Sequence, residues 1–228
     1  MKNYIVFDCY QTLIYKKDLE RIVQKFLADE MRIKISLKYI KYAFDAIYHR
    51  YKFQHPRFES AQDRKEFYIK YNKELMGIIG VDVSSDFAGR LNQELGKLSS
   101  YTCYPDVIPA LKYFKIQKKI PLSIIANWTE TLEKILEDTN LRQYFNFVHS
   151  SHNLKLEKPN PEIFKKTLAE IIEKYDKVYY IGDDYELDIV PARQANLIPV
   201  LIDRNNRYPK NVDCIKIRNL NNLKKIVR

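Results

Sequence analysis

The sequence predicts an α/β fold: a doubly wound parallel sheet with a block of helices inserted into it. From residue 104 onward, short apolar runs alternate with helical patterns, which is typical of parallel strands joined by right-handed crossover helices. A similar apolar run, Tyr4–Phe7, lies alone near the start of the chain and is expected to join the same sheet. The helical stretch between them is then an insertion. We expect a core domain of residues 1–14 and 101–228, and a helical cap domain of residues 15–100 lying over the active crevice.

Each element of this prediction follows from a local pattern. In residues 15–100, apolar side chains recur at helical spacing in four stretches, which begin near Leu19, Tyr39, Phe67 and Asp86. Gly77 and Gly80 are expected to end the third helix, and Pro56 to break the middle of the block. Buried parallel strands are predicted where short apolar runs occur, at Leu122–Ile125, Phe147–Val148, Val178–Ile181 and Val200–Ile202. The intervening helices are predicted at Val107–Lys118, Thr129–Thr139, Pro161–Lys174 and Asp188–Ala195.

Composition and charge exclude several classes of function. Of the 228 residues, 46% are hydrophobic and 30% charged, as in globular proteins, and no apolar run approaches the roughly 20 residues that cross a bilayer. The first residues do not form a signal peptide, so a cytoplasmic protein without a membrane partner is expected. The three cysteines are widely spaced, which indicates reduced thiols and argues against both a disulfide framework and a structural zinc site.

The net charge of +10 is spread along the whole chain. Because acidic residues are interleaved with the lysines and no basic run stands out, we expect no nucleic-acid partner. A basic surface does steer anions toward a protein, and a small anionic substrate is expected. The chain is expected to be a monomer or a homodimer.

Four polar stretches fall at the ends of predicted strands or open a helix. They are Asp8 after the first strand, residues 126–129 after the second, residues 158–161 before a helix, and residues 182–188 after the strand Val178–Ile181. In an open parallel sheet, reactive groups gather beyond the carboxyl ends of the strands, so Asp8 is placed where an aspartate can act as a nucleophile.

Carboxylates at two such strand ends make a candidate site for a hard cation. Mg²⁺ prefers oxygen ligands and usually keeps waters and a substrate phosphate. Asp8 and Asp183 are the first candidates, with Asp188 as a third and the backbone carbonyl of Tyr10 as a further ligand. Glu186, in the same stretch, is expected to face solvent, as is Asp184.

The order and types of these residues resemble the haloacid dehalogenase (HAD) superfamily of hydrolases. The resemblance rests on four motifs, FDCYQTL, IIANW, EKPNPEIF and IGDDYELDIVPARQANL, and on the segment YPDVIPALKYF before the second. It implies a Rossmann-like core with a cap domain.

The resemblance also implies roles for individual residues. Asp8 would attack the substrate and form a covalent aspartyl intermediate, with Lys158 holding Asp8 and the transferring group. Asp183 would bind Mg²⁺, and Asp188 would bind it directly or through water. It further implies that Asn127 would contact phosphoryl oxygens and that Thr12 would brace the first loop. Apart from the resemblance, we expect Trp128 to form a wall of the substrate pocket or a contact with the cap.

Two positions depart from the phosphatases of this superfamily. Tyr10 stands where they have a second aspartate, which acts as acid and base, and a phenol with an ordinary pKa of about 10 is a poor base. Ala126 stands where a Ser or Thr usually hydrogen-bonds the phosphoryl group.

Three functions therefore stay open. The first is a Mg²⁺-dependent phosphatase acting on a small phosphorylated metabolite, in which Tyr10 and Ala126 are expected to slow turnover. The second is a metal-independent 2-haloacid dehalogenase, since that branch has a tyrosine at the position of Tyr10, although its fourth motif is typically Ser-Asn based. The third is a catalytically degenerate member used for binding or regulation.

Overall fold

The computed structural model describes residues 2–53, 60–96 and 101–227, and these fall into two compact units. The first unit is Met1–Tyr15 with Tyr101–Arg228, and the second is Lys16–Ser100. The chain leaves and re-enters the first unit through two short paired strands, β2 (Ile14–Lys16) and β3 (Tyr101–Cys103). Whether the second unit acts as a cap over the first stays a prediction.

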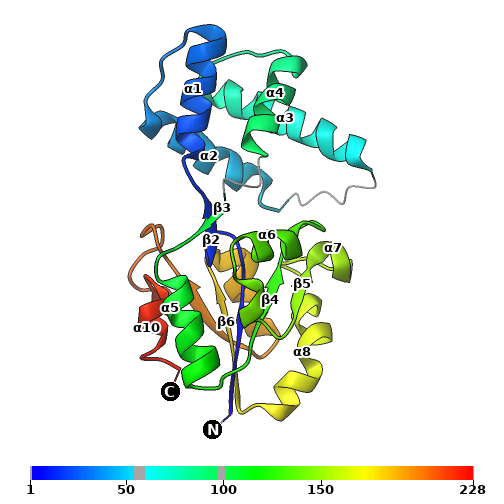
Figure 1. Ribbon diagram of the computed structural model, residues 1–228, viewed down its shortest axis with the longest axis vertical. Helices are drawn as coiled ribbons and strands as arrows, with labels where there is room; N and C mark the ends of the chain where they lie inside the picture. Colours follow the sequence, from blue (N-terminus) through cyan, green and yellow to red (C-terminus); the bar gives the residue numbers. More distant parts are fainter. Residues whose placement is uncertain (1, 54–59, 97–100, 228) are drawn as a thin grey trace. The chain divides into compact units, whose positions relative to one another are not determined.

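The first unit is built on a six-stranded parallel sheet with the strand order β5-β4-β1-β6-β7-β8. Its strands are β1 (Asn3–Phe7), β4 (Leu122–Ala126), β5 (Val148–Ser150), β6 (Lys177–Gly182), β7 (Ile198–Ile202) and β8 (Ile215–Ile217). Strands β5, β4 and β6 of this sheet are labelled in Figure 1. The central strand β1 pairs with β4 on one side and β6 on the other, so Phe7 lies level with both Ile124 and Ile181. The next residues of all three strands therefore emerge at one edge of the sheet.

Helices cover both faces of this sheet, which confirms the doubly wound α/β fold. They are α5 (Val107–Lys112), η2 (Tyr113–Gln117), α6 (Leu132–Asp138), η3 (Arg142–Tyr144), α7 (Ser151–Leu154), α8 (Glu162–Lys174), η4 (Tyr185–Ile189), α9 (Val190–Gln194) and α10 (Leu220–Leu223). Alternate residues of β1 face opposite layers: Ile5 and Phe7 pack with α5, α6 and α10, whereas Tyr4 and Val6 pack with α8 and α9. This division follows from the period of two in a strand.

The second unit contains four helices packed around their own apolar core: α1 (Leu19–Met31), α2 (Leu37–Tyr51), α3 (Ala61–Ile79) and α4 (Ser85–Leu95). Serine side chains cap three of the helix N-termini, because Ser36, Ser60 and Ser84 each accept a hydrogen bond from a backbone N–H in the first turn. Most residues of the apolar faces predicted from helical spacing supply this core, but Tyr39, which begins the second predicted stretch, is 44% exposed.

Several boundaries differ from the prediction. Gly77 lies inside α3, and only Gly80, with a φ of 87°, ends that helix. The helix predicted over 107–118 changes to a π-helical turn, η2, at Tyr113, and a second π-helical turn, η4, precedes α9. Strands β2, β3 and β8 and helix α10 were not predicted. Pro56, expected to break the helical block, lies outside the described residues.

Two further expectations can be compared with the fold. Cys9 is fully buried in the core cluster. Like Cys103 and Cys214 it is a free thiol, and the sequence predicted reduced thiols. None of the helices in the described ranges combines the length and the apolar character that crossing a bilayer requires.

Candidate active site

The candidate site lies where β1, β4 and β6 end. Asp8 directly follows β1, and its backbone N–H donates to the carbonyl of Ile181 at 2.8 Å, which extends the pairing of β1 with β6 by one residue. Asp183 directly follows β6, one residue beyond Gly182, which the strand register places level with Asp8, so the two carboxylates leave neighbouring strands at the same edge of the sheet. Asp8 is buried, with only 7% of the residue exposed.

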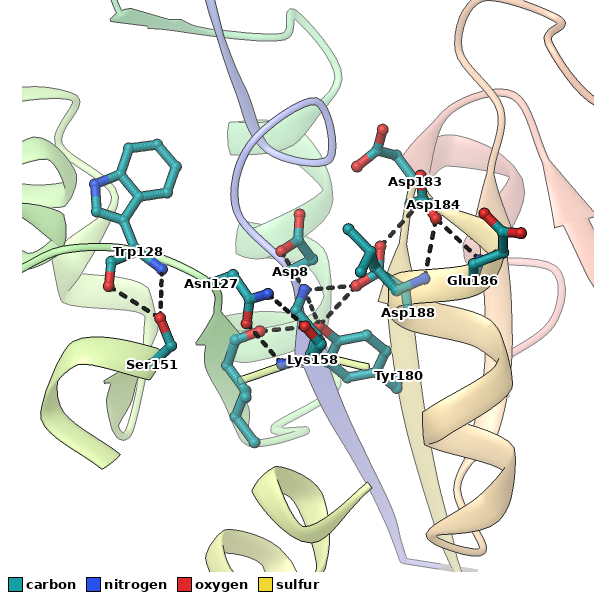
Figure 2. Close-up of polar contacts among 12 residues, drawn as sticks. Asp8, Asn127, Trp128, Ser151, Lys158, Tyr180, Asp183, Asp184, Glu186 and Asp188 are labelled. Atoms are coloured by element: carbon teal, nitrogen blue, oxygen red, sulfur yellow. Dashed lines mark hydrogen bonds and ion pairs between the residues drawn. The ribbon is translucent and has the colours of Figure 1, made fainter. Parts of the chain in front are cut away.

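Lys158 reaches this point from the loop that precedes α8, and Asn127 fixes its backbone. The Asn127 side chain donates to the Lys158 carbonyl at 2.8 Å and accepts from the Lys158 N–H at 2.8 Å (Figure 2). This reciprocal pair joins the end of β4 to the loop that carries the lysine. That Asn127 also contacts phosphoryl oxygens stays a prediction.

The Lys158 ammonium has an acceptor for each of its three protons. It donates to Asp8 Oδ1 at 2.7 Å, to Asp188 Oδ1 at 2.5 Å and to the Tyr180 hydroxyl at 3.0 Å (Figure 2). The Tyr180 hydroxyl itself donates to the carbonyl of Ile125 at 2.9 Å. With all three donors used and the side chain 3% exposed, the ammonium has little freedom to move.

Asp188 is held equally firmly, on the π-helical turn after β6. Its Oδ1 accepts from Lys158, and its Oδ2 accepts from the backbone N–H of Asp184 at 3.0 Å. Gly182 makes this placement possible, because a Cβ at position 182 would lie 2.3 Å from Asp188 Cγ. Since both oxygens of Asp188 already have partners, its most evident role is to position Lys158; metal binding by Asp188 stays a prediction.

Asp183 pairs with a second cation that the sequence did not reveal. Arg207 Nη2 donates to Asp183 Oδ2 at 2.6 Å and to the Asp183 backbone carbonyl at 3.0 Å. Asp184, expected to face solvent, is instead 3% exposed, and its carboxylate accepts from the N–H groups of Glu186 and Leu187 at the start of η4. Glu186 is exposed, as expected.

The electrostatics of the cluster favour a divalent cation. Burial raises the pKa of Asp8 to about 6, although Lys158 opposes this, and burial also raises the pKa of Asp183 well above its ordinary range. Burial alone would lower the pKa of Lys158, but the carboxylates of Asp188 and Asp8 outweigh it and the pKa rises well above its usual value. Buried acids with raised pKa values are short of positive charge.

The geometry of the donors fits the same ion. Asp8, Asp183 and Asp188 each offer a carboxylate oxygen, and these atoms all lie within 4.8 Å of one another. Carboxylate oxygens are the kind of ligand that Mg²⁺ prefers. The three residues therefore fit a hard cation by their chemistry as well as by their charge.

Comparison with known proteins shows the family. The model of the haloacid dehalogenase-like hydrolases matches residues 2–196. The chain belongs to the haloacid dehalogenase-like hydrolase family. The resemblance inferred from the four motifs is thereby confirmed.

Individual curated relatives match only part of the chain. An uncharacterized yeast protein, YMR130W of Saccharomyces cerevisiae, is 32% identical over 124 residues, covering 48% of this chain and 41% of that protein. The glyceraldehyde 3-phosphate phosphatase of Methanopyrus kandleri is 31% identical over 119 residues, 48% of each chain. The match thus spans about half or less of these two curated relatives.

Solved structures share the fold across the whole chain. The putative HAD-hydrolase YfnB of Bacillus subtilis, solved with magnesium bound, has a TM-score of 0.73 at 18% identity and covers 99% of this chain and 98% of its own. An L-2-haloacid dehalogenase and a HAD phosphatase from Thermococcus onnurineus are among the structures with this fold. Fold alone therefore does not separate these two activities.

Two further predicted residues, Tyr10 and Trp128, lie beside each other. The ring centroid of Tyr10 lies 6.2 Å from that of Trp128 and 6.4 Å from that of Tyr101. The Trp128 indole points away from Lys158 (Figure 2), and its backbone N–H donates to Ser151 Oγ at 3.1 Å. Catalytic or substrate-binding roles for Tyr10 and Trp128 stay predictions.

Thr12 and Ala126 complete the set. Thr12 is fully buried, and its carbonyl accepts two hydrogen bonds from Arg204, at 2.8 and 3.2 Å, which brace the first loop. The Thr12 hydroxyl has no hydrogen-bond partner among the described residues. Ala126 is the last residue of β4 and offers only a methyl group at the edge of the site.

Two residues with clear roles at the site, Tyr180 and Arg207, were missed. Tyr180 lies within the apolar run of β6 and was counted as core, although a tyrosine there must also find a partner for its hydroxyl. Arg207 follows β7 in a loop, and no local pattern indicates that it turns back to Asp183.

Proposed function

We propose that this hydrolase is a Mg²⁺-dependent phosphatase that acts on a small phosphorylated metabolite through an aspartyl-phosphate intermediate. The observation that carries the proposal is the buried cluster in which Asp8, Asp183 and Asp188 bring carboxylate oxygens within 4.8 Å of one another. Lys158, bonded to both Asp8 and Asp188, supplies the fixed positive charge beside them. The similarity to a glyceraldehyde 3-phosphate phosphatase supports a phosphate ester as substrate.

In the proposed reaction an oxygen of Asp8 attacks phosphorus while the bond from phosphorus to the ester oxygen breaks. The electron pair of that bond stays on the leaving oxygen, which takes a proton from the Tyr10 phenol or from water. Lys158 holds the attacking carboxylate through Oδ1 and limits its rotation. When bound to Asp8 and Asp183, Mg²⁺ would neutralise charge on the phosphoryl oxygens.

In the second half of the reaction a water oxygen attacks the phosphorus of the aspartyl phosphate. The bond from phosphorus to the Asp8 oxygen breaks, the Asp8 carboxylate is restored, and one proton of the water passes to solvent. Where the Tyr10 phenol gave its proton in the first half, solvent returns a proton to it. Because Tyr10 offers no carboxylate to take the proton of the water, we expect this half to limit turnover.

The test is phosphate release from a panel of phosphate monoesters, including p-nitrophenyl phosphate and glyceraldehyde 3-phosphate, with Mg²⁺ and with a chelator. We expect release that requires Mg²⁺ and that falls by roughly 10³-fold or more in Asp8→Asn. The matched control is Asp138→Asn, a change at an exposed carboxylate of α6 that pairs with Lys134 on the same helix. Release that is equal in Asp8→Asn and wild type would refute the proposal.

A second candidate is favoured by one residue. Tyr10 matches the tyrosine of the 2-haloacid dehalogenase branch, whose members use no metal. Halide release from a 2-haloacid that persists in a chelator, without phosphatase activity, would select this function. Turnover of neither class, combined with tight binding of a ligand or partner, would identify a catalytically degenerate member.

A further inference from the structure

Arg207 is a cation that the proposed mechanism does not use. It lies in the loop after β7, and Asp203, which is 2% exposed, shapes that loop by accepting from the N–H groups of Arg207 and Tyr208 at 2.7 and 3.1 Å. The loop thereby directs Arg207 onto Asp183, where it holds both the carboxylate, at 2.6 Å, and the backbone carbonyl, at 3.0 Å. A buried aspartate thus shapes the loop so that this guanidinium meets a candidate metal ligand.

The formal charges at the site show what this contact does. When ionised, Asp8, Asp183 and Asp188 face the two cations Lys158 and Arg207, and the cluster has one net negative charge. A divalent ion turns that into one net positive charge, and a bound phosphate dianion then returns the site to one negative charge. Neither the empty nor the fully loaded site carries a large excess of charge.

We infer that Arg207 is the resident counter-ion of Asp183, which weakens divalent-metal binding and, once the metal is bound, leaves the site positive enough to hold an anionic substrate. The inference rests on the proposed metal-dependent function. Its physical basis is that a guanidinium on the same carboxylate repels an incoming cation and attracts an incoming anion.

The inference predicts that loss of the Arg207 charge changes the affinity for metal and the affinity for phosphate in opposite directions. Replacing Arg207 by glutamine removes one positive charge, so metal should bind more tightly and phosphate less tightly. A loss of structure alone would weaken both. Because the Arg207 side chain is 32% exposed, solvent screens the charge, and we expect changes of about tenfold in each affinity.

The experiment measures Mg²⁺ binding and then inorganic phosphate binding in the presence of saturating Mg²⁺, by titration calorimetry of the whole chain. The variants are Arg207→Gln and Arg207→Lys, the second of which keeps the charge and should restore near wild-type affinities. The matched control is Arg142→Gln, because Arg142 likewise bonds one carboxylate, that of Glu133, and one backbone carbonyl, that of Phe145. Circular dichroism melts show whether each variant is folded.

We expect tighter Mg²⁺ binding and weaker phosphate binding in Arg207→Gln, with both unchanged in Arg142→Gln. Mg²⁺ affinity that is unchanged or lower in a folded Arg207→Gln protein would overturn the inference while leaving the proposed function intact. Failure of wild type and Arg207→Gln alike to bind Mg²⁺ would instead overturn the metal-dependent function on which the inference rests.

Discussion

Gly182→Ala tests whether the site depends on close packing between the end of β6 and Asp188. A Cβ at position 182 would lie 2.3 Å from Asp188 Cγ, 2.4 Å from Oδ2 and 2.5 Å from Cβ. Rotation of the Asp188 side chain does not move Asp188 Cβ, so it cannot relieve the contact between that atom and the new Cβ at position 182. The backbone of η4 therefore has to move. The carboxylate then moves away from Lys158, which lies 2.5 Å away, and from the N–H of Asp184.

The size of the effect follows from two contributions. Overpacking a buried position costs about 1–3 kcal/mol. Weakening a buried ion pair adds to this, because breaking one outright costs about 3–5 kcal/mol. Lys158 keeps its bond to Asp8, so only part of the ion-pair stabilisation should be lost. We therefore expect Gly182→Ala to lower the free energy of unfolding by about 2–4 kcal/mol in total.

The assay is urea denaturation of Gly182→Ala beside Gly77→Ala as the matched control. Gly77 lies inside α3, where an added Cβ meets nothing within 4 Å, so alanine should stabilise the helix by about 0.5–1 kcal/mol. Turnover should fall in Gly182→Ala and stay unchanged in Gly77→Ala. A Gly182→Ala protein that matches wild type in both stability and turnover would refute the reasoning.

Three further changes probe neighbouring parts of the site. Tyr10→Asp should raise phosphatase turnover by roughly 10²-fold, because it supplies the missing base; no gain in steady-state assays would show that this base is not limiting. Tyr180→Phe removes a hydroxyl that accepts from Lys158 and donates to Ile125, and should cost about 1–3 kcal/mol in urea denaturation, whereas an unchanged midpoint would contradict the packing described here. Because the folded-state pKa of Asp8 is raised from 3.8 to about 6, the folded form holds this proton more tightly than the unfolded form, so metal-free protein should lose stability as pH rises through that window. The increase in Tm on adding Mg²⁺ should therefore be larger at about pH 7.5 than at about pH 5, and an equal increase at both would count against this assignment.

Apolar runs predicted the sheet well, because a strand buried on both faces is apolar over most of its length. This holds for β1, β4, β6 and β7, each found where its run predicted it. Strand β8 was missed because it is short and lies at the edge of the sheet, where Ile215 is 38% exposed and Lys216 interrupts the apolar pattern. Such a segment resembles a loop in sequence.

The candidate site, like the sheet, was predicted only in part from the sequence. The positions of Asp8 and Asp183 follow from strand ends, and those of Lys158 and Asp188 from the motifs they lie in. The hydrogen bonds that hold these groups could not be read from sequence, because they join residues that are distant in the chain. Arg207 is an example, since its place beside Asp183 depends on how the loop after β7 folds.

The most direct test of the proposed chemistry is a crystal structure of the protein with Mg²⁺ and beryllium fluoride, which mimics a phosphoryl group. We expect beryllium bonded to an oxygen of Asp8, Mg²⁺ coordinated by Asp8 and Asp183, and the Lys158 ammonium still in contact with Asp8. Fluoride and metal density located elsewhere, with the carboxylates of Asp8 and Asp183 still bonded only to Lys158 and Arg207, would contradict it.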